Sequence, residues 1–108
     1  MAGSWDKVLK IDLSTGKTED MELEEEVVKQ YLGGNGLGIY LLNKETDGRV
    51  EAFSEDNPLI FVPGALNGSK VPMTEKCGFY SKSPLTGIMA EGIFDGALGE
   101  QLKKSGYD

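Results

Sequence analysis

Few residues in this chain have side chains that could carry out covalent chemistry. Histidine is absent, and the single cysteine, Cys77, has Lys76 beside it. A neighbouring cation lowers the pKa of a thiol, but no histidine is present to act as base, so a buried, packed cysteine is the favoured interpretation. Ser69, Ser81 and Ser83 lack a histidine partner for the same reason. The sequence therefore predicts no catalytic set of its own.

Two further segments have sequence patterns that could form a ligand-binding site. The acidic run Glu22–Glu26 could hold a cation, although a solvated helix start explains it without one and is favoured. The segment Gly33–Gly38 resembles a dinucleotide-binding loop, but the G-x-G-x-x-G pattern fails because position 39 is Ile39. A helix, and not the required strand, is expected before this loop. Gly16-Lys17-Thr18 does not complete a phosphate loop, because the pattern G-x-x-x-x-G-K-S/T needs glycine at position 11, which is Ile11. Nucleotide-binding folds of both kinds are therefore rejected.

The glycine content is the most unusual feature of the composition. Fifteen of the 108 residues are glycine, which is about twice the usual frequency of roughly 7%. They gather at Gly33–Gly38, at Gly64 and Gly68, and from Gly87 to Gly99. Two interpretations stay open: many tight turns, or a backbone platform on which a planar or phosphorylated ligand lies.

Length and charge limit the protein class. A chain of 108 residues fits one small domain. Its net charge of −7 argues against a nucleic-acid partner, which needs a clustered basic surface. No apolar run approaches the roughly 20 residues that span a bilayer, and no secretion signal opens the chain. The default is a soluble, cytoplasmic domain with no membrane partner.

Hydrophobic patterning predicts a fold of the α+β class. Alternation over Lys7–Leu13 and Lys17–Leu23 indicates an N-terminal β-hairpin. Short strands are expected at Leu59–Val62, which we expect to be buried, at Gly78–Ser81, and from Ile88–Ala90 onward.

Three helices are expected between and after these strands. The first follows the acidic run and ends at Gly33-Gly34. The second begins after Asn35-Gly36 and runs through Leu42, and its apolar character implies burial. The third covers Gly96–Lys104. The chain then ends on Tyr107-Asp108, with an exposed aromatic side chain, which indicates either a frayed tail or an interrupted domain.

Several segments, read in order, resemble one family. They are Trp5, Ile11–Gly16, Tyr31–Gly38, Ser54–Phe61, Pro63–Gly68, Lys82–Gly87, Leu98-Gly99 and Leu102–Asp108. Together they resemble the start of the tungsten-containing aldehyde ferredoxin oxidoreductases, over nearly the whole chain. Each motif is weak alone, but the ordered set is fairly specific.

The resemblance implies an enzyme much longer than this chain. Residues 1–108 would be part of its N-terminal domain, a β-rich base that holds one side of a bis-pterin cofactor carrying tungsten or molybdenum. Domains absent from this chain would supply the substrate pocket and the cysteines of a [4Fe-4S] cluster. The whole enzyme would oxidise an aldehyde to a carboxylate and pass electrons through the cluster to ferredoxin. The partners implied are the remainder of the polypeptide, ferredoxin and a small aldehyde, with a homo-oligomer left open.

The resemblance also carries a set of cofactor-binding residues. Lys76 matches the family's basic pterin contact, as a point charge in place of a forked guanidinium. Gly92, Ile93, Asp95 and Gly96 match the turn that lines the cofactor, with isoleucine where a polar contact is expected. Asp95 could hold a cation such as magnesium between pterin phosphates, although capping a turn is the commoner role of aspartate. No residue is assigned as catalytic or as a metal ligand.

A second hypothesis belongs to another class. The chain could be a small acidic binding or assembly module that keeps the fold without a cofactor. Such a module should be soluble alone, whereas a cofactor base separated from its enzyme should expose the apolar surface that other domains cover.

Overall fold

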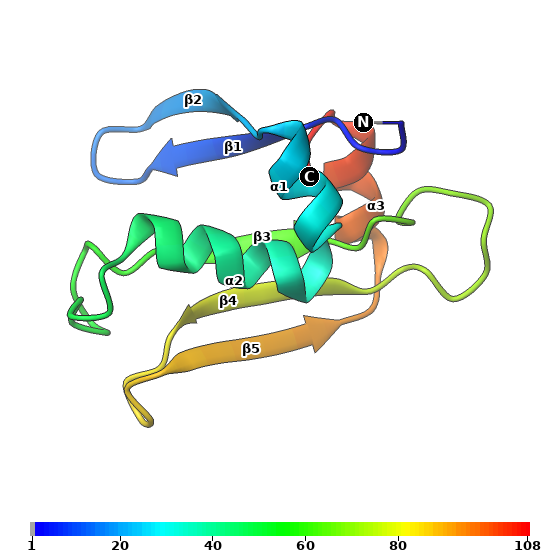
Figure 1. The fold of residues 1–108 in the computed structure, drawn as a ribbon. Coiled ribbons are helices and arrows are strands. Elements are labelled where there is room, and N and C mark those ends of the chain that lie inside the picture. The colour runs from blue at the N-terminus through cyan, green and yellow to red at the C-terminus, as the bar shows by residue number, and fades with distance from the viewer. Residues whose placement is uncertain (1) are drawn as a thin grey trace.

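The computed structural model describes residues 2–108 as one α+β domain, as the sequence predicts (Figure 1). In chain order its elements are β1 (Lys7–Asp12), β2 (Lys17–Glu22), α1 (Glu25–Tyr31), α2 (Gly34–Glu45), β3 (Ile60–Pro63), β4 (Cys77–Lys82), β5 (Met89–Phe94) and α3 (Ala97–Lys104). Within these residues no helix is both long and apolar enough to cross a membrane.

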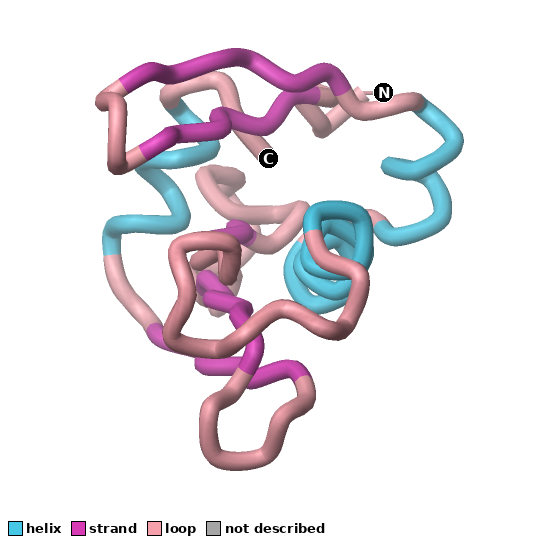
Figure 2. The backbone as a smooth tube through the Cα atoms, turned by 90° about the vertical axis from the view of Figure 1, so that its left-hand side faces the viewer, coloured by secondary structure: helices cyan, strands magenta, loops and turns pink. Residues whose placement is uncertain are grey.

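The strands form two separate antiparallel sheets. β1 and β2 make the predicted hairpin, and β3, β4 and β5 make a three-stranded sheet in that order. Helix α2 packs against one face of the larger sheet, and the hairpin lies above both of them in the end-on view (Figure 2). An ion pair of 2.8 Å between Lys10 Nζ of β1 and Glu45 Oε2 of α2 joins the hairpin to the helix layer.

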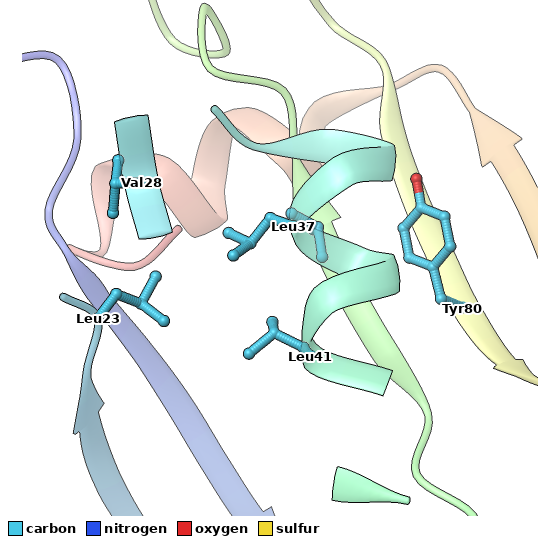
Figure 3. Packing of buried hydrophobic residues seen from close by; sticks show 6 residues of the cluster. Leu23, Val28, Leu37, Leu41 and Tyr80 are labelled. Carbon is cyan, nitrogen blue, oxygen red and sulfur yellow. The ribbon is translucent and has the colours of Figure 1, made fainter. Parts of the chain in front are cut away.

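The hydrophobic core lies where these three layers meet. It consists of Leu23, Val28, Leu37, Leu41, Val62 and Tyr80, drawn from the hairpin end, both helices and two strands (Figure 3). Burying apolar side chains of this size contributes roughly 1.5–3 kcal/mol each. The predicted burial of the second helix is therefore confirmed along one side.

Two sequence expectations about these elements are wrong in detail. Helix α2 begins at Gly34, three residues earlier than predicted, because Gly33 adopts a φ of 136° and serves as its N-cap. Strand β3 is not buried on both faces: Val62 is fully buried, but Phe61 is 44% exposed. The difference arises because successive side chains of a strand point to opposite faces, and α2 covers one face of this sheet.

The end of the chain is anchored by Asp108, which the sequence placed in an exposed and frayed or interrupted tail. The buried Asp108 carboxylate accepts hydrogen bonds from the backbone N–H groups of Trp5 (2.7 Å) and Asp6 (2.6 Å) and from Ser4 Oγ (2.7 Å). It also pairs with the ammonium group of Lys103. The segment before β1 is thereby fixed to the end of α3.

Tyr107 supports the same connection. Its ring is half-buried, and its hydroxyl donates a hydrogen bond of 2.9 Å to Asp20 in β2. The backbone N–H of Asp108 donates to the Lys7 carbonyl at 2.8 Å, so the last residues lie directly against β1.

We predict that Gly38→Ala destabilises the domain although it improves helix propensity. An added Cβ would collide with the ring of Tyr80, which is 1% exposed and cannot move aside. Overpacking of this kind costs about 1–3 kcal/mol, more than the roughly 1 kcal/mol that alanine gains over glycine in a helix. Urea unfolding should show lower stability for Gly38→Ala and equal or higher stability for Asn43→Ala, an exposed position in the same helix. A stabilised Gly38→Ala protein would contradict the close packing of α2.

We predict that Asp108→Asn lowers the free energy of unfolding by roughly 3–5 kcal/mol, because it leaves the buried ammonium of Lys103 without its counter-charge. Lys104→Ala is the matched control, since it breaks an exposed pair with Glu100 on the same helix and should change stability by less than about 1 kcal/mol. Equal effects of the two substitutions in urea unfolding would refute the anchoring role of Asp108.

The ion pair of Asp108 also predicts that the stability of the domain depends on pH. Burial alone would raise the pKa of the Asp108 carboxyl, but hydrogen bonds from Lys103 and Ser4 outweigh burial and lower that pKa below its ordinary value. The stabilisation is therefore complete above the unfolded pKa of about 3.9 and is lost as the pH falls through the lower folded pKa. Between about pH 5 and pH 2, stability should fall more steeply in the original protein than in Asp108→Asn.

Candidate functional site

The structure brings together two of the residues that the sequence assigned to cofactor binding. Lys76 directly precedes β4 and Asp95 directly follows β5. Because Cys77 and Phe94 are register partners, Lys76 and Asp95 meet at the end of the sheet. Lys76 Nζ lies 3.0 Å from Asp95 Oδ1, and both side chains are more than 60% exposed. The lysine is therefore accessible to a ligand in solution.

Gly92 and Ile93 lie in strand β5, and the prediction that positions 92–96 form a turn is wrong for this part. β5 pairs with β4 through Phe94, so the turn is limited to Asp95 and Gly96. Gly92 and Ile93 also face opposite sides of the sheet, because side chains alternate along a strand. Ile93 is 58% exposed on the edge strand.

A neighbouring ring explains why position 92 is glycine. Gly92 is the register partner of Phe79, and a Cβ at position 92 would collide with the Phe79 ring. That ring lies between Phe61 and Phe94, with centroid separations of 6.4 Å and 6.1 Å. Gly92 thus makes room for an aromatic side chain from the adjacent strand.

Two helices begin at the end of the sheet where Lys76 lies. Gly96 is the N-cap of α3 and Gly33 is the N-cap of α2, each with a φ of 136° and with no capping hydrogen bond from a side chain. A Cβ on Gly33 would lie 3.5 Å from the carbonyl oxygen of Pro63, the register partner of Cys77. Both helix starts therefore lie at the right-hand end of the sheet in Figure 1.

Charges of both signs lie at this end of the sheet, because Glu100 is in the first turn of α3 and Glu75 is next to Lys76. A helix N-terminus carries a partial positive charge and free N–H groups, and Lys76 adds a full positive charge beside two of them. Asp95 offsets part of that charge through its ion pair with Lys76. The arrangement combines one ammonium group with free backbone N–H groups and contains no group poised for proton transfer.

The remaining candidate residues do not add a reactive centre. Cys77 is 1% exposed, and burial raises the pKa of its thiol, which confirms the packing interpretation. Glu24, Glu25 and Glu26 occupy the start of α1, and Glu25 pairs with Lys29 at 3.1 Å, as a helix start predicts. Among residues 2–108 no group of three or more acidic or cysteine side chains could hold a metal ion.

Sequence reasoning missed two residues that shape this end. Gly33 was assigned only to the end of the first helix, although it also starts α2. Asn67 appears in the sequence only as part of the segment Pro63–Gly68, but its buried side chain accepts a hydrogen bond from the Gly64 backbone and closes the turn after β3. The Gly-Gly pair between two helical patterns was the available signal for Gly33. Nothing local signals the burial of Asn67.

Comparison with known proteins identifies the family. The model of the aldehyde ferredoxin oxidoreductase N-terminal domain matches residues 8–108. The chain belongs to this family. Tungsten-containing aldehyde ferredoxin oxidoreductase from Pyrococcus horikoshii is 41% identical over 108 residues, which is all of this chain and 18% of that enzyme. The chain thus spans about a fifth of such a relative.

Two further relatives of this aldehyde ferredoxin oxidoreductase domain carry different names. The WOR-like subunit of aliphatic sulfonate oxidoreductase from Pyrococcus furiosus is 37% identical over 105 residues, covering 94% of this chain and 16% of that subunit. A solved chain of the active site complex BamBC of benzoyl coenzyme A reductase superposes with a TM-score of 0.93 and 32% identity, over 98% of this chain and 16% of that one. The α+β fold is therefore the fold of this family.

We predict that the effect of Gly92→Ala changes sign with the residue at position 79. With Phe79 present, the new Cβ displaces the ring and lowers stability by about 1–2 kcal/mol. In a Phe79→Ala background the collision is absent, and alanine should stabilise the strand relative to glycine by roughly 0.5–1 kcal/mol. Urea unfolding of the four proteins measures both values. An equal loss in the two backgrounds would mean that Gly92 is required for some reason other than the ring.

Proposed function

We propose that this chain is the N-terminal part of a tungsten or molybdenum bis-pterin oxidoreductase and forms part of the base that holds one side of the pterin. The observation that carries the proposal is the match of the family's N-terminal domain to residues 8–108, together with 41% identity over all 108 residues to tungsten-containing relatives. A relationship of this extent implies that residues 1–108 are arranged as in those enzymes.

The residues at the end of the sheet fit a phosphorylated pterin. Lys76 presents an accessible ammonium group, and the glycine-capped starts of α2 and α3 present backbone N–H groups without competing side-chain caps. We assign the phosphate contact to Lys76 and the lining of the cofactor to Asp95 and Gly96 at the same end of the sheet. Gly92 and Ile93 lie in β5 on opposite faces, so they cannot both line the cofactor. Asp95 would either hold a cation such as magnesium at the phosphates or keep the lysine oriented through the 3.0 Å ion pair.

The redox chemistry would belong to groups that this chain does not hold alone. The metal–pterin group supplies the two-electron oxidation of an aldehyde to a carboxylate, and a [4Fe-4S] cluster passes the electrons to ferredoxin. A cluster needs about four thiolates, and Cys77 is the single, buried cysteine here. We therefore propose that the rest of the polypeptide binds the cluster and the substrate in the cytoplasm, and that this segment alone is inactive.

The names of the relatives bear on whether this segment selects the substrate. They describe an aldehyde, an aliphatic sulfonate and a coenzyme A thioester system, although all three share this domain. We infer that the segment provides what these enzymes have in common and that other segments select the substrate. An aldehyde is the first candidate because the relatives at 41% identity carry that name.

The surface composition weighs against the alternative of a self-contained acidic module. Among the described residues, the neighbouring rings of Phe61 and Phe79 are 44% and 39% exposed, with their centroids 6.4 Å apart. A contiguous exposed apolar patch of this kind is typical of a surface that contacts another protein or domain. A segment that other domains cover would have this composition.

We predict that this chain can replace the aligned first residues of the Pyrococcus furiosus aldehyde ferredoxin oxidoreductase and that the chimera carries tungsten and pterin. Lys76→Ala in the chimera should lower pterin content about fivefold, the ratio that loss of about 1 kcal/mol gives. Lys70→Ala, an exposed lysine in the preceding loop, is the matched control and should leave pterin content unchanged. Metal analysis and pterin fluorescence measure the outcome.

The two parts of this prediction fail separately. Unchanged pterin content in Lys76→Ala would remove the lysine from the site but leave the domain assignment standing. A folded chimera without tungsten or pterin would instead favour the module that keeps the fold without a cofactor.

A further inference from the structure

The three-stranded sheet has one face covered by α2 and one face that is covered only at the end where Pro63 and Cys77 are buried. The side chains on the side away from α2 belong to alternate residues of the three paired strands. None of these residues is charged, and we call them the aromatic face. They are Phe61, Pro63, Cys77, Phe79, Ser81, Ala90, Gly92 and Phe94. Charged residues make up 27% of the chain, so a sheet face without any charged residue is unusual.

The centre of the aromatic face is exposed to solvent. Phe61 and Phe79 are 44% and 39% exposed, although three neighbouring rings pack side by side there. Within residues 2–108, α3 packs against β3 at one end of this side, where a Cβ on Gly99 would lie 3.2 Å from the Cβ of Cys77. The rings themselves remain uncovered.

Gly92 makes this face flat. The Phe79 ring extends across Gly92 onto the edge strand, where any larger residue would displace it. A broad, flat, uncharged aromatic surface matches the centre of a protein interface, which is depleted in charge and rich in aromatic residues. It does not match a small-molecule pocket, which is concave.

We propose that the aromatic face is an interdomain surface, covered by the polypeptide that makes up the remaining four fifths of the relatives. The length comparison carries this choice, because the chain corresponds to 18% of the Pyrococcus enzymes and 16% of the solved reductase chain. The occupant therefore presents an apolar surface of its own to the three rings. This inference rests on family membership and is independent of the pterin contact.

A second copy of this chain is the less favoured occupant. Each copy carries a net charge of −7, so two copies repel each other at the short distance that a face-to-face contact requires. The uncharged aromatic face offers no opposite charge to offset that repulsion.

Radical footprinting with mass spectrometry tests the proposal on two proteins: the 108-residue chain alone, and the full-length Pyrococcus furiosus chimera described above. We expect Phe61 and Phe79 to be labelled at least fivefold less in the chimera than in the isolated chain. Leu85, which is 92% exposed at the β4–β5 hairpin, is the control and should be labelled equally in both. The chimera is produced without tungsten, so the result does not depend on cofactor loading.

Three outcomes would overturn the proposal. Equal labelling of Phe61 and Phe79 in the two proteins would show that the aromatic face stays open. Protection of Leu85 in the chimera as strong as that of Phe61 and Phe79 would show that the whole domain is shielded, with no role specific to this face. Protection of the rings in the isolated chain that increases with its concentration would identify a second copy as the occupant.

A pair of variants checks that the rings make the contact. Phe61→Thr with Phe79→Thr keeps strand-favouring residues while removing both rings. In the chimera, this double variant should raise the labelling of Phe94 severalfold, and the single variant Phe61→Thr serves if the double variant does not fold. Unchanged labelling of Phe94 in a folded variant would contradict the proposal.

Discussion

The close approach of α2 to the larger sheet is the constraint on which the rest of the structure depends. The Tyr80 ring fills the space between them, and it fits because Gly38 of α2 and Gly78 of β4 have no side chains where the ring lies. Any side chain at either position would separate the two layers. Because the helix is held at this distance, its start lies against Pro63, at the end of the sheet where Lys76 is found.

The sheet then serves different purposes on its two faces and at its end. One face supplies Val62 and Tyr80 to the core and gives the domain its stability. The other face carries exposed rings that contribute little to stability in isolation. The end of the sheet combines Lys76 with two glycine-capped helix starts, and this is where we propose that the pterin phosphate binds. A platform of this kind can be shared by enzymes that act on different substrates.

The sequence predicts most of the elements because their signals are local. Alternation reveals the hairpin, the acidic residues before Val27 and Val28 reveal α1, and the periodicity ending at Lys104 reveals α3. Sequence reasoning fails where a distant residue decides the structure. The glycine at position 92 looks like part of a turn until the ring of Phe79 from the neighbouring strand is placed over it. Likewise, Asp108 contacts backbone groups about one hundred positions earlier, which no local pattern indicates.

Of the candidate site, resemblance supplied Lys76 and Asp95 separately, and only the strand register places them together.

The central claim is that these residues are the first segment of a longer metal–pterin oxidoreductase. Sequencing the gene beyond codon 108 tests that claim most directly. The account predicts several hundred further codons, including closely spaced cysteines and a later one that together could bind a [4Fe-4S] cluster. A stop codon immediately after Asp108 would contradict it, and would leave a separate binding module that shares only the fold of its relatives.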